Sequence, residues 1–236
     1  MTIDGSDIIS LDCSSTVLDT IFFMKRNKIR RIVVTCEGKM AGLFTVDEAI
    51  KQIIGGSVED KLKDTKLKRL VNVESNEPYE IAKSMIANSV DAVIFSRRII
   101  TEKDLVRGFP WNDEEKMFDL AVKAIAIEGF TRLSTAAEIM VRNSIRHLPV
   151  AEEQPLGMLS ARDVVYRFSD RLSLQEEVKL VMVPYLVKGD KTLSLREGTE
   201  IMMSKGIGSL VFEDQGLYIV TLKDLVKHIY MYSMKY

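Results

Sequence analysis

The pattern of apolar and polar positions repeats four times along the chain. Each copy opens with apolar residues at helical spacing, as Ala136, Ile139 and Met140 show in the third copy. A short apolar run, a turn and a second short apolar run follow, as in IRHLPV and GMLS. Spacing of i, i+3 and i+4 favours a helix, whereas short runs bounded by turn residues favour strands. The pattern therefore predicts helix, strand, turn, strand and helix in each copy.

Three landmarks keep the same register in all four copies. A methionine ends the first helical pattern, a β-branched residue opens the first strand, and a hydroxyl residue ends the second strand. The hydroxyl residues recur at intervals of about 60 residues, as expected of an internal repeat. The landmarks are Met24, Ile29 and Thr45; Met85, Val90 and Thr101; Met140, Ile145 and Ser160; and Met202, Ile207 and Thr221. We expect the methionines to fill the core rather than to bind a ligand.

The four copies predict an α/β (α+β) fold organised as two tandem pairs. One copy is too small to bury both its helices and its sheet, so copies should pack in pairs. A short leading strand, such as AIAIE at 124–128, is expected before each copy. The predicted domains are 1–110, with repeats at about 8–55 and 68–109, and 111–236, with repeats at about 122–170 and 181–232.

The segment between the two predicted domains has the signals of a helix start. Pro110 precedes WNDEEKMFDLAVKAIAI, Asn112 or Asp113 could cap it, and acidic residues fill the first turn. We therefore expect a connecting helix over 111–127.

The composition limits the classes of function. The 236 residues include 33 Lys and Arg and 34 Asp and Glu, a net charge of -1 that favours neither nucleic acid nor an anionic membrane as partner. No apolar run approaches the ~18 residues of a membrane span, and MTIDGSDIISLDC does not read as a secretory signal. Cys13 and Cys36 have no CxxC motif and no nearby His, so free thiols and a cytoplasmic location are expected.

The third repeat carries a recognisable motif. The pattern I-x-x-L-P-V followed by G-x-x-S-x-R-D, in IRHLPVAEEQPLGMLSARDVV, resembles a cystathionine-β-synthase (CBS) domain. RRIVV with GLFTVDEA, DAVIF with RIITEKDL, and GSLVF with YIVTLKDL match it less fully. The resemblance implies paired repeats, called Bateman modules, that bind adenosine-containing ligands in clefts and regulate another protein. Four repeats in one chain resemble the γ subunit of AMP-activated kinase and stand-alone archaeal and bacterial CBS proteins.

The motif at the end of each second strand has two interpretations. It reads TVDE, TEKD, SARD and TLKD, which fits a capping box at a helix start. The resemblance implies in addition that the Asp binds a ribose and that the hydroxyl residue helps to bind a phosphate at the helix N-terminus. It assigns ribose binding to Asp104, Asp163 and Asp224, and phosphate binding to Thr101, Ser160 and Thr221, supported by the cations Lys103, Arg162 and Lys223.

The first repeat departs from this motif. Glu48 replaces the Asp, and Asp47 replaces the basic residue before it. The longer acid misplaces a ribose contact, and the extra carboxylate opposes a phosphate by up to ~1–4 kcal/mol at contact distance. We expect the site built on this repeat to be empty or degenerate.

Basic residues also lie where the first strands of two repeats begin. In the CBS family such residues can reach ligand phosphates, although a solvated or structural role is the alternative. The residues are Arg146 and His147 in the third repeat and Arg30 and Arg31 in the first.

The leading hypothesis is a non-catalytic sensor of AMP, ADP or ATP with no catalytic cofactor and no metal. S-adenosylmethionine is less favoured because the basic residues prefer an anion. A scaffold with vestigial clefts remains an alternative, as does a nucleic-acid binder that uses a small basic cluster of Arg30, Arg31, Arg97 and Arg98. No P-loop and no Ser-His-Asp or Cys-His constellation supports an enzyme. The expected protein partner is an unknown regulated protein, and a homodimer through the module faces stays open.

Overall fold

The computed structural model describes residues 2–232 and confirms the mixed helix and strand fold. Helix, strand, strand and helix follow one another four times. The first repeat contains α1 (Val17–Arg26), β3 (Arg31–Cys36), β4 (Lys39–Thr45) and α2 (Val46–Gly55), and the second α3 (Pro78–Asn88), β5 (Ala92–Phe95), β6 (Arg98–Thr101) and α4 (Glu102–Gly108). The third contains α5 (Leu133–Asn143), β8 (His147–Ala151), β9 (Pro155–Ser160) and α6 (Ala161–Arg171), and the fourth α7 (Leu195–Ser204), β10 (Ser209–Glu213), β11 (Leu217–Thr221) and α8 (Leu222–Tyr232).

The two strands of each repeat form an antiparallel hairpin with a constant register. The hydroxyl residue that ends the second strand always lies opposite the start of the first strand. The pairs are Arg31 with Thr45, Ala92 with Thr101, His147 with Ser160, and Ser209 with Thr221. This register places the predicted strand-end residues beside the start of the second helix of the same repeat.

The leading strand is complete only in the first repeat, where β2 (Ser10–Asp12) runs parallel to β3. The other repeats have single parallel bridges at that place, namely Asn72 with Ile94, Ile127 with Val150, and Lys188 with Val211. Two further short strands join hairpins elsewhere in the chain, because β1 (Ser6–Asp7) pairs with β6 and β7 (Val122–Lys123) pairs with β11.

The prediction of a helix over 111–127 is wrong. Asn112 Oδ1 does accept hydrogen bonds from the amides of Glu114 and Glu115, at 3.0 and 2.9 Å. The turn that it caps is followed only by the 3-10 helix η2 (Met117–Leu120) and by β7. Pairing of β7 with β11 competes with helix formation, and the propensity of the segment yields to it. Two further 3-10 helices are η1 (Leu62–Asp64) and η3 (Val178–Leu180).

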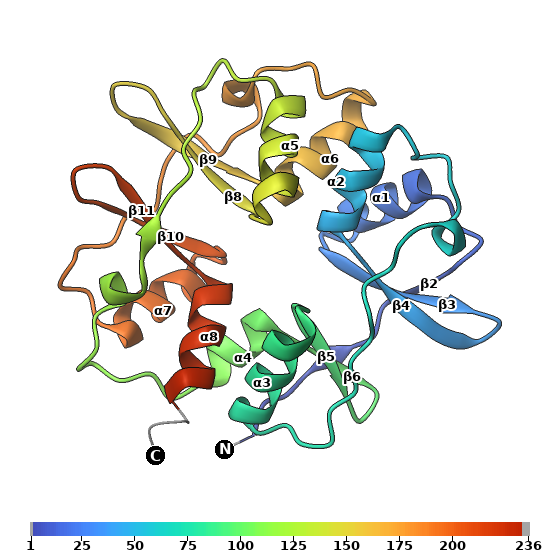
Figure 1. Cartoon of the computed structure of the whole chain (residues 1–236), viewed down its shortest axis with the longest axis horizontal. Coiled ribbons are helices and arrows are strands. Elements are labelled where there is room, and N and C mark those ends of the chain that lie inside the picture. The colour runs from blue at the N-terminus through green and yellow to red at the C-terminus, as the bar shows by residue number, and fades with distance from the viewer. Residues whose placement is uncertain (1, 233–236) are drawn as a thin grey trace. The chain divides into compact units, whose positions relative to one another are not determined.

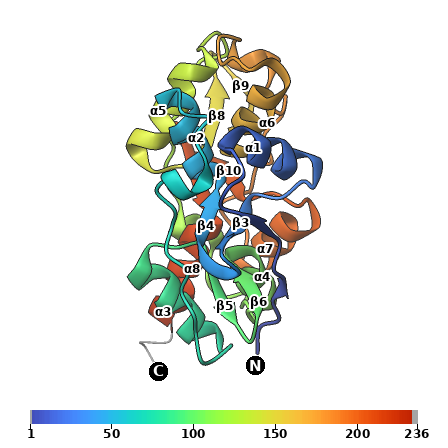
Figure 2. The ribbon, with the colours of Figure 1, turned by 90° about the vertical axis from the view of Figure 1, so that its right-hand side faces the viewer.

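Alternate repeats, not successive ones, pack into compact units. We call residues 9–69 and 125–186 the odd unit, because they hold repeats one and three. Residues 2–8, 70–124 and 187–232 form the even unit, with repeats two and four. In the odd unit α6 packs on α1 and α2, and α5 packs on α2. In the even unit α8 packs on α3 and α4, and α4 packs on α7, as the two views show (Figures 1 and 2).

These units differ from the division at residue 110 that the sequence predicted. Each unit has its own hydrophobic core, drawn from two repeats that are far apart in the chain. Packing of the apolar helix faces determines which repeats pair, because burying apolar area stabilises the fold whatever the order of the repeats along the chain. The four landmark methionines are at most 2% exposed, which confirms them as core residues: Met24 and Met140 in the odd unit, Met85 and Met202 in the even unit.

Cys13 and Cys36 form a disulfide, which corrects the expectation of free thiols. Cys13 follows β2 and Cys36 ends β3, and these parallel strands pair Asp12 with Thr35. The register brings the two Cα atoms to 5.3 Å, within the usual range for a disulfide. The spacing of the cysteines could not show this, because their contact depends on the pairing of two strands.

Replacing Cys13 by Ser is expected to lower the free energy of unfolding by about 3 kcal/mol, because the disulfide closes a loop with a sequence separation of 23. Urea unfolding of the oxidised protein, the reduced protein and the variant measures this change. The reduced protein and the variant should coincide. A wild-type transition that does not respond to the reductant would show that the two cysteines are not paired in solution.

Among residues 2–232, no helix is both long and apolar enough to cross a membrane.

Candidate functional site

The second helix of every repeat starts with the predicted capping box. Its acid accepts hydrogen bonds from both the backbone N–H and the hydroxyl of the residue three positions earlier. Ser160 donates to Asp163 Oδ2 at 2.9 Å from N and 2.6 Å from Oγ. The same two contacts join Thr45 to Glu48, Thr101 to Asp104, and Thr221 to Asp224. The structural role of the motif is therefore confirmed in all four repeats, and a ligand role would be additional.

The two units divide the predicted site residues between them. The odd unit holds Arg30, Arg31, Arg146, His147, Ser160, Arg162 and Asp163. The even unit holds Thr101, Lys103, Asp104, Thr221, Lys223 and Asp224. The predicted residues of the strand ends thus all belong to the odd unit.

Four arginines of the odd unit lie close enough to repel one another. The pKa of Arg30 is lowered from 12.5 to about 10, first by burial and then by the charges of Arg162, Arg31 and Arg146. Arg30 immediately precedes β3 and Arg31 begins it, Arg146 immediately precedes β8, and Arg162 lies in the first turn of α6. Two hairpins and one helix start therefore bring the positive charge together.

His147 lies in the same place and is neutral at pH 7. Burial lowers its pKa from 6.5 to about 3, and the charges of Arg30, Arg146 and Arg162 act in the same direction. We call Arg30, Arg31, Arg146, His147 and Arg162 the basic cluster.

The carboxylate of Asp47 lies against the basic cluster. Arg146 donates to it twice, from Nε to Oδ1 at 2.8 Å and from Nη2 to Oδ2 at 2.5 Å. Lys68 Nζ donates to Oδ2 at 2.7 Å. Burial alone would raise the pKa of Asp47, but Arg146 and Lys68 lower it to about 2. Asp47 is therefore ionised across the physiological range and neutralises part of the cluster.

Two residues that join the basic cluster to its surroundings were not found from the sequence. Lys68 lies in a connector without a motif, and only its backbone pairing with Leu43 of β4 brings it to Asp47. Tyr166 of α6 donates its hydroxyl to the carbonyl of Ile29, at 2.9 Å, and so holds the residue before Arg30. Its spacing in α6 looks like that of a core position, which gave no signal for this contact.

Asp163 borders a small cavity in the odd unit. Its volume is about 220 Å³, and its walls are formed by Asp163, Tyr166, Arg167, Asp170, Leu180 and Val181. Burial raises the pKa of Tyr166, whereas Arg162 and Arg30 oppose this rise. The acid predicted to bind a ribose and the basic cluster therefore lie around the same side chain.

The even unit lacks the strand-end charges of the odd unit. At the positions that correspond to Arg30, Arg31, Arg146 and His147 it has Asp91, Ala92, Gly208 and Ser209. Its predicted cations are those of the helix starts, Lys103 and Lys223. The two units therefore differ in how strongly they can attract an anion.

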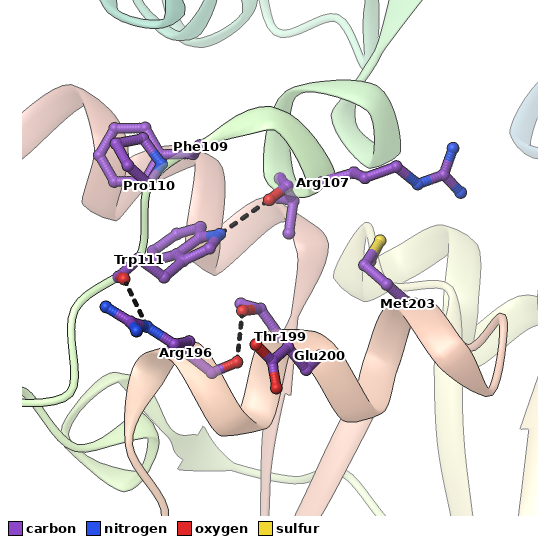
Figure 3. A pocket seen from close by; sticks show the side chains of 9 residues that line it. Arg107, Phe109, Pro110, Trp111, Arg196, Thr199, Glu200 and Met203 are labelled. Carbon is purple, nitrogen blue, oxygen red and sulfur yellow. Dashed lines mark hydrogen bonds between the residues drawn. The ribbon is translucent and has the colours of Figure 1, made fainter.

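A larger cavity, of about 450 Å³, lies in the even unit and contains none of the predicted site residues (Figure 3). Residues 106–111 and α7 line it. Trp111 Nε1 donates to the Val106 carbonyl at 2.7 Å, and Arg196 Nε donates to the Trp111 carbonyl at 3.1 Å. Thr199 also donates within its own helix. These donors serve the wall itself, so the cavity is less suited to a charged ligand than the basic cluster.

A metal site is not evident in the described part of the chain. Within residues 2–232, no three His, Cys, Asp or Glu side chains gather where they could hold a metal ion.

Comparison with protein families identifies the class. Residues 3–55 and 120–170 match the family model described as the CBS domain. These segments contain the first and third repeats, which supply the basic cluster. These two segments of the chain therefore match the CBS domain.

The protein MJ1225 of Methanocaldococcus jannaschii is similar to this chain along nearly its whole length. It is 24% identical over 269 residues, covering 94% of this chain and 95% of MJ1225. The crystal structure of MJ1225, described as a proposed archaeal homologue of γ-AMPK, matches with a TM-score of 0.80 at 20% identity. The match covers 96% of this chain and 97% of MJ1225. The crystal structure of a conserved protein from Pyrococcus horikoshii matches with a TM-score of 0.63 at 17% identity, over 97% of each chain. These likenesses show the fold.

Proposed function

We propose that this chain is a non-catalytic regulatory protein that binds adenine nucleotides, with the nucleotide phosphates at the basic cluster. The observation that carries this proposal is the crowding of Arg31, Arg146 and Arg162 around Arg30: burial first, and then these three charges, lower the pKa of Arg30 to about 10. Like charges brought together at partly buried positions cost stability, and an anion removes that cost. Guanidinium groups also match the geometry of a phosphate.

The helix start of α6 supports the same ligand class. The capping box engages Oδ2 of Asp163, so Oδ1 is the atom that a ribose hydroxyl would approach. Ser160 and the first amides of α6 would face a phosphate, which suits the positive end of the helix dipole. AMP, ADP and ATP combine both groups. S-adenosylmethionine has the ribose but carries a sulfonium, which the basic cluster would repel.

The ligand sites of the even unit are proposed on the motif alone. Asp104 and Asp224 would bind the ribose, with Thr101, Lys103, Thr221 and Lys223 near the phosphate. Because the even unit lacks the strand-end arginines, we expect it to bind nucleotides more weakly than the odd unit.

Regulation of another protein is supported by the family and by the description of MJ1225 as a proposed archaeal homologue of γ-AMPK. Nucleotide binding would shift the chain between two states that the regulated protein distinguishes, which requires different affinities for these states. The proposed cytoplasmic location is supported by the sequence only, and the disulfide removes the support that free thiols would have provided.

Calorimetric titration with AMP, ATP, adenosine and S-adenosylmethionine tests this proposal, using the wild type and Asp163→Glu. Glu keeps the capping box, as Thr45 and Glu48 show in this chain. We expect AMP to bind the wild type more tightly than adenosine does. The variant should lose about tenfold to a hundredfold in affinity, which corresponds to the loss of a hydrogen bond to a charged group.

Asp19→Glu is the matched control. Asp19 makes a similar cap with Thr16 at the start of α1, in the same unit but outside the basic cluster. It should leave AMP affinity unchanged. Failure of all four ligands to bind the wild type would contradict the proposal and favour a scaffold. Equal affinities for AMP and adenosine would show that the phosphate does not contribute to binding.

A further inference from the structure

We propose that Asp47 is a tethered competitor of the nucleotide phosphate, so that the ligand must displace the Asp47 carboxylate from Arg146 in order to bind. This inference rests on the proposed function and concerns how the same site is regulated. It differs from the expectation that Asp47 merely weakens a site of its own repeat, because the cation that it holds belongs to the third repeat.

The contacts of Asp47 are those of a bound anion. A carboxylate that accepts two parallel hydrogen bonds from one guanidinium imitates the geometry of a phosphate on arginine. Lys68 contributes a third hydrogen bond, and both side chains of the ion pair with Arg146 are about three-quarters shielded, at 24% and 25% exposure. The first turn of α2 places Asp47 where the other three repeats carry Lys103, Arg162 and Lys223.

The positive charge around Asp47 explains why a carboxylate is favourable at this position. The basic cluster contains four arginines, and the charges of Arg31, Arg146 and Arg162 repel that of Arg30. Asp47 also opposes the effect of the arginines on the pKa of His147, so it faces the cluster as a whole and not Arg146 alone. The ion pair of Asp47 with Arg146 stabilises the ligand-free protein, and while it is formed Arg146 cannot bind a ligand phosphate.

Displacement selects among ligands by charge. A phosphate monoester carries nearly two negative charges at pH 7, whereas Asp47 carries one, so a dianion can replace it at the cluster and a weakly bound monoanion such as chloride cannot. Asp47 therefore acts as a specificity-determining residue that reserves the cluster for phosphate.

Displacement would also reach a connector between the units. Lys68 loses one of its partners when Asp47 moves, and Lys68 precedes Arg69, after which the chain leaves the odd unit. The backbone of Lys68 remains paired with Leu43, so the change is confined to its side chain.

Titration of AMP and of inorganic pyrophosphate into the full chain tests the inference, with the wild type compared to Asp47→Asn. The substitution keeps the shape and removes the charge. We expect both probes to bind Asp47→Asn at least about fivefold more tightly than the wild type, the lower end of typical coupling between sites. Asp64→Asn removes an exposed carboxylate of the same unit outside the cluster and should leave affinity unchanged.

A double-mutant cycle separates competition at Arg146 from a general charge effect. In an Arg146→Gln background, Asp47→Asn should change AMP affinity by less than twofold, because the contact in dispute is gone. An undiminished gain in that background would overturn the tethered competitor and leave only long-range electrostatics.

The outcomes distinguish this inference from the proposed function. If the wild type binds AMP and Asp47→Asn binds it no more tightly, the inference is wrong and the proposed function stands. If the wild type binds neither probe, both are wrong. If Asp47→Asn is unfolded without an anion, pyrophosphate should restore its circular dichroism spectrum, and failure to restore it would contradict the inference.

Discussion

Replacing Arg30 by Met is expected to stabilise the ligand-free protein by about 1–3 kcal/mol, the order implied by a pKa lowered to about 10. The Arg30 side chain is partly buried beside three like charges, and Met replaces it with an uncharged chain. The same substitution should weaken AMP binding at least about tenfold, since it removes a charged hydrogen-bond donor. Opposite effects on stability and binding would mark a side chain kept for a ligand.

Urea unfolding without ligand and calorimetric titration with AMP measure the two effects. Arg142→Met removes an exposed arginine from the last turn of α5 and is the control, with a change within about 0.5 kcal/mol and unaltered binding. Loss of stability in Arg30→Met together with unchanged AMP affinity would show that Arg30 has a structural role.

Acidification from pH 7 to pH 5 is expected to destabilise the ligand-free protein through His147. The folded-state pKa of His147 is lowered to about 3, by burial first and then by the arginines, whereas the unfolded chain titrates near 6.5. The unfolded state therefore binds the proton first. Stability is fully present above about pH 6.5 and falls by up to about 1.4 kcal/mol per pH unit as the pH decreases toward 3.

The pH dependence of unfolding in the wild type and in His147→Gln checks this expectation. The variant should lose the slope between pH 6.5 and pH 5, because its side chain does not titrate. Asp47 does not contribute in that range, since its pKa is lowered to about 2. Saturating AMP should reduce the wild-type slope, because a bound dianion favours the protonated imidazole. Parallel curves for the two proteins would contradict the placement of His147 among the arginines.

The local structure of each repeat follows from its own residues and could be predicted. The hydroxyl and acid of each capping box lie three positions apart, so Ser160 and Asp163 determine the start of α6 without help from distant contacts. The helical spacing of the apolar residues predicts the core methionines in the same way. These features depend on neighbours within a few residues.

Long-range pairing accounts for what the sequence did not reveal. The disulfide depends on the parallel register of β2 with β3, and the connector after Pro110 forms a strand because β11 is available to pair with it. Packing of alternate repeats depends on the complementary faces of helices such as α2 and α6. Asp47 was recognised as an opponent of phosphate, but its bond to Arg146 required the third repeat to pack on the first.

A crystal structure of the protein soaked with AMP is the most direct test of the central claim. We expect the phosphate within hydrogen-bonding distance of Arg30 and Arg146, the ribose at Asp163, and the Asp47 carboxylate turned away from Arg146. AMP bound instead in the cavity beside Trp111, with the pair of Asp47 and Arg146 intact, would contradict the account.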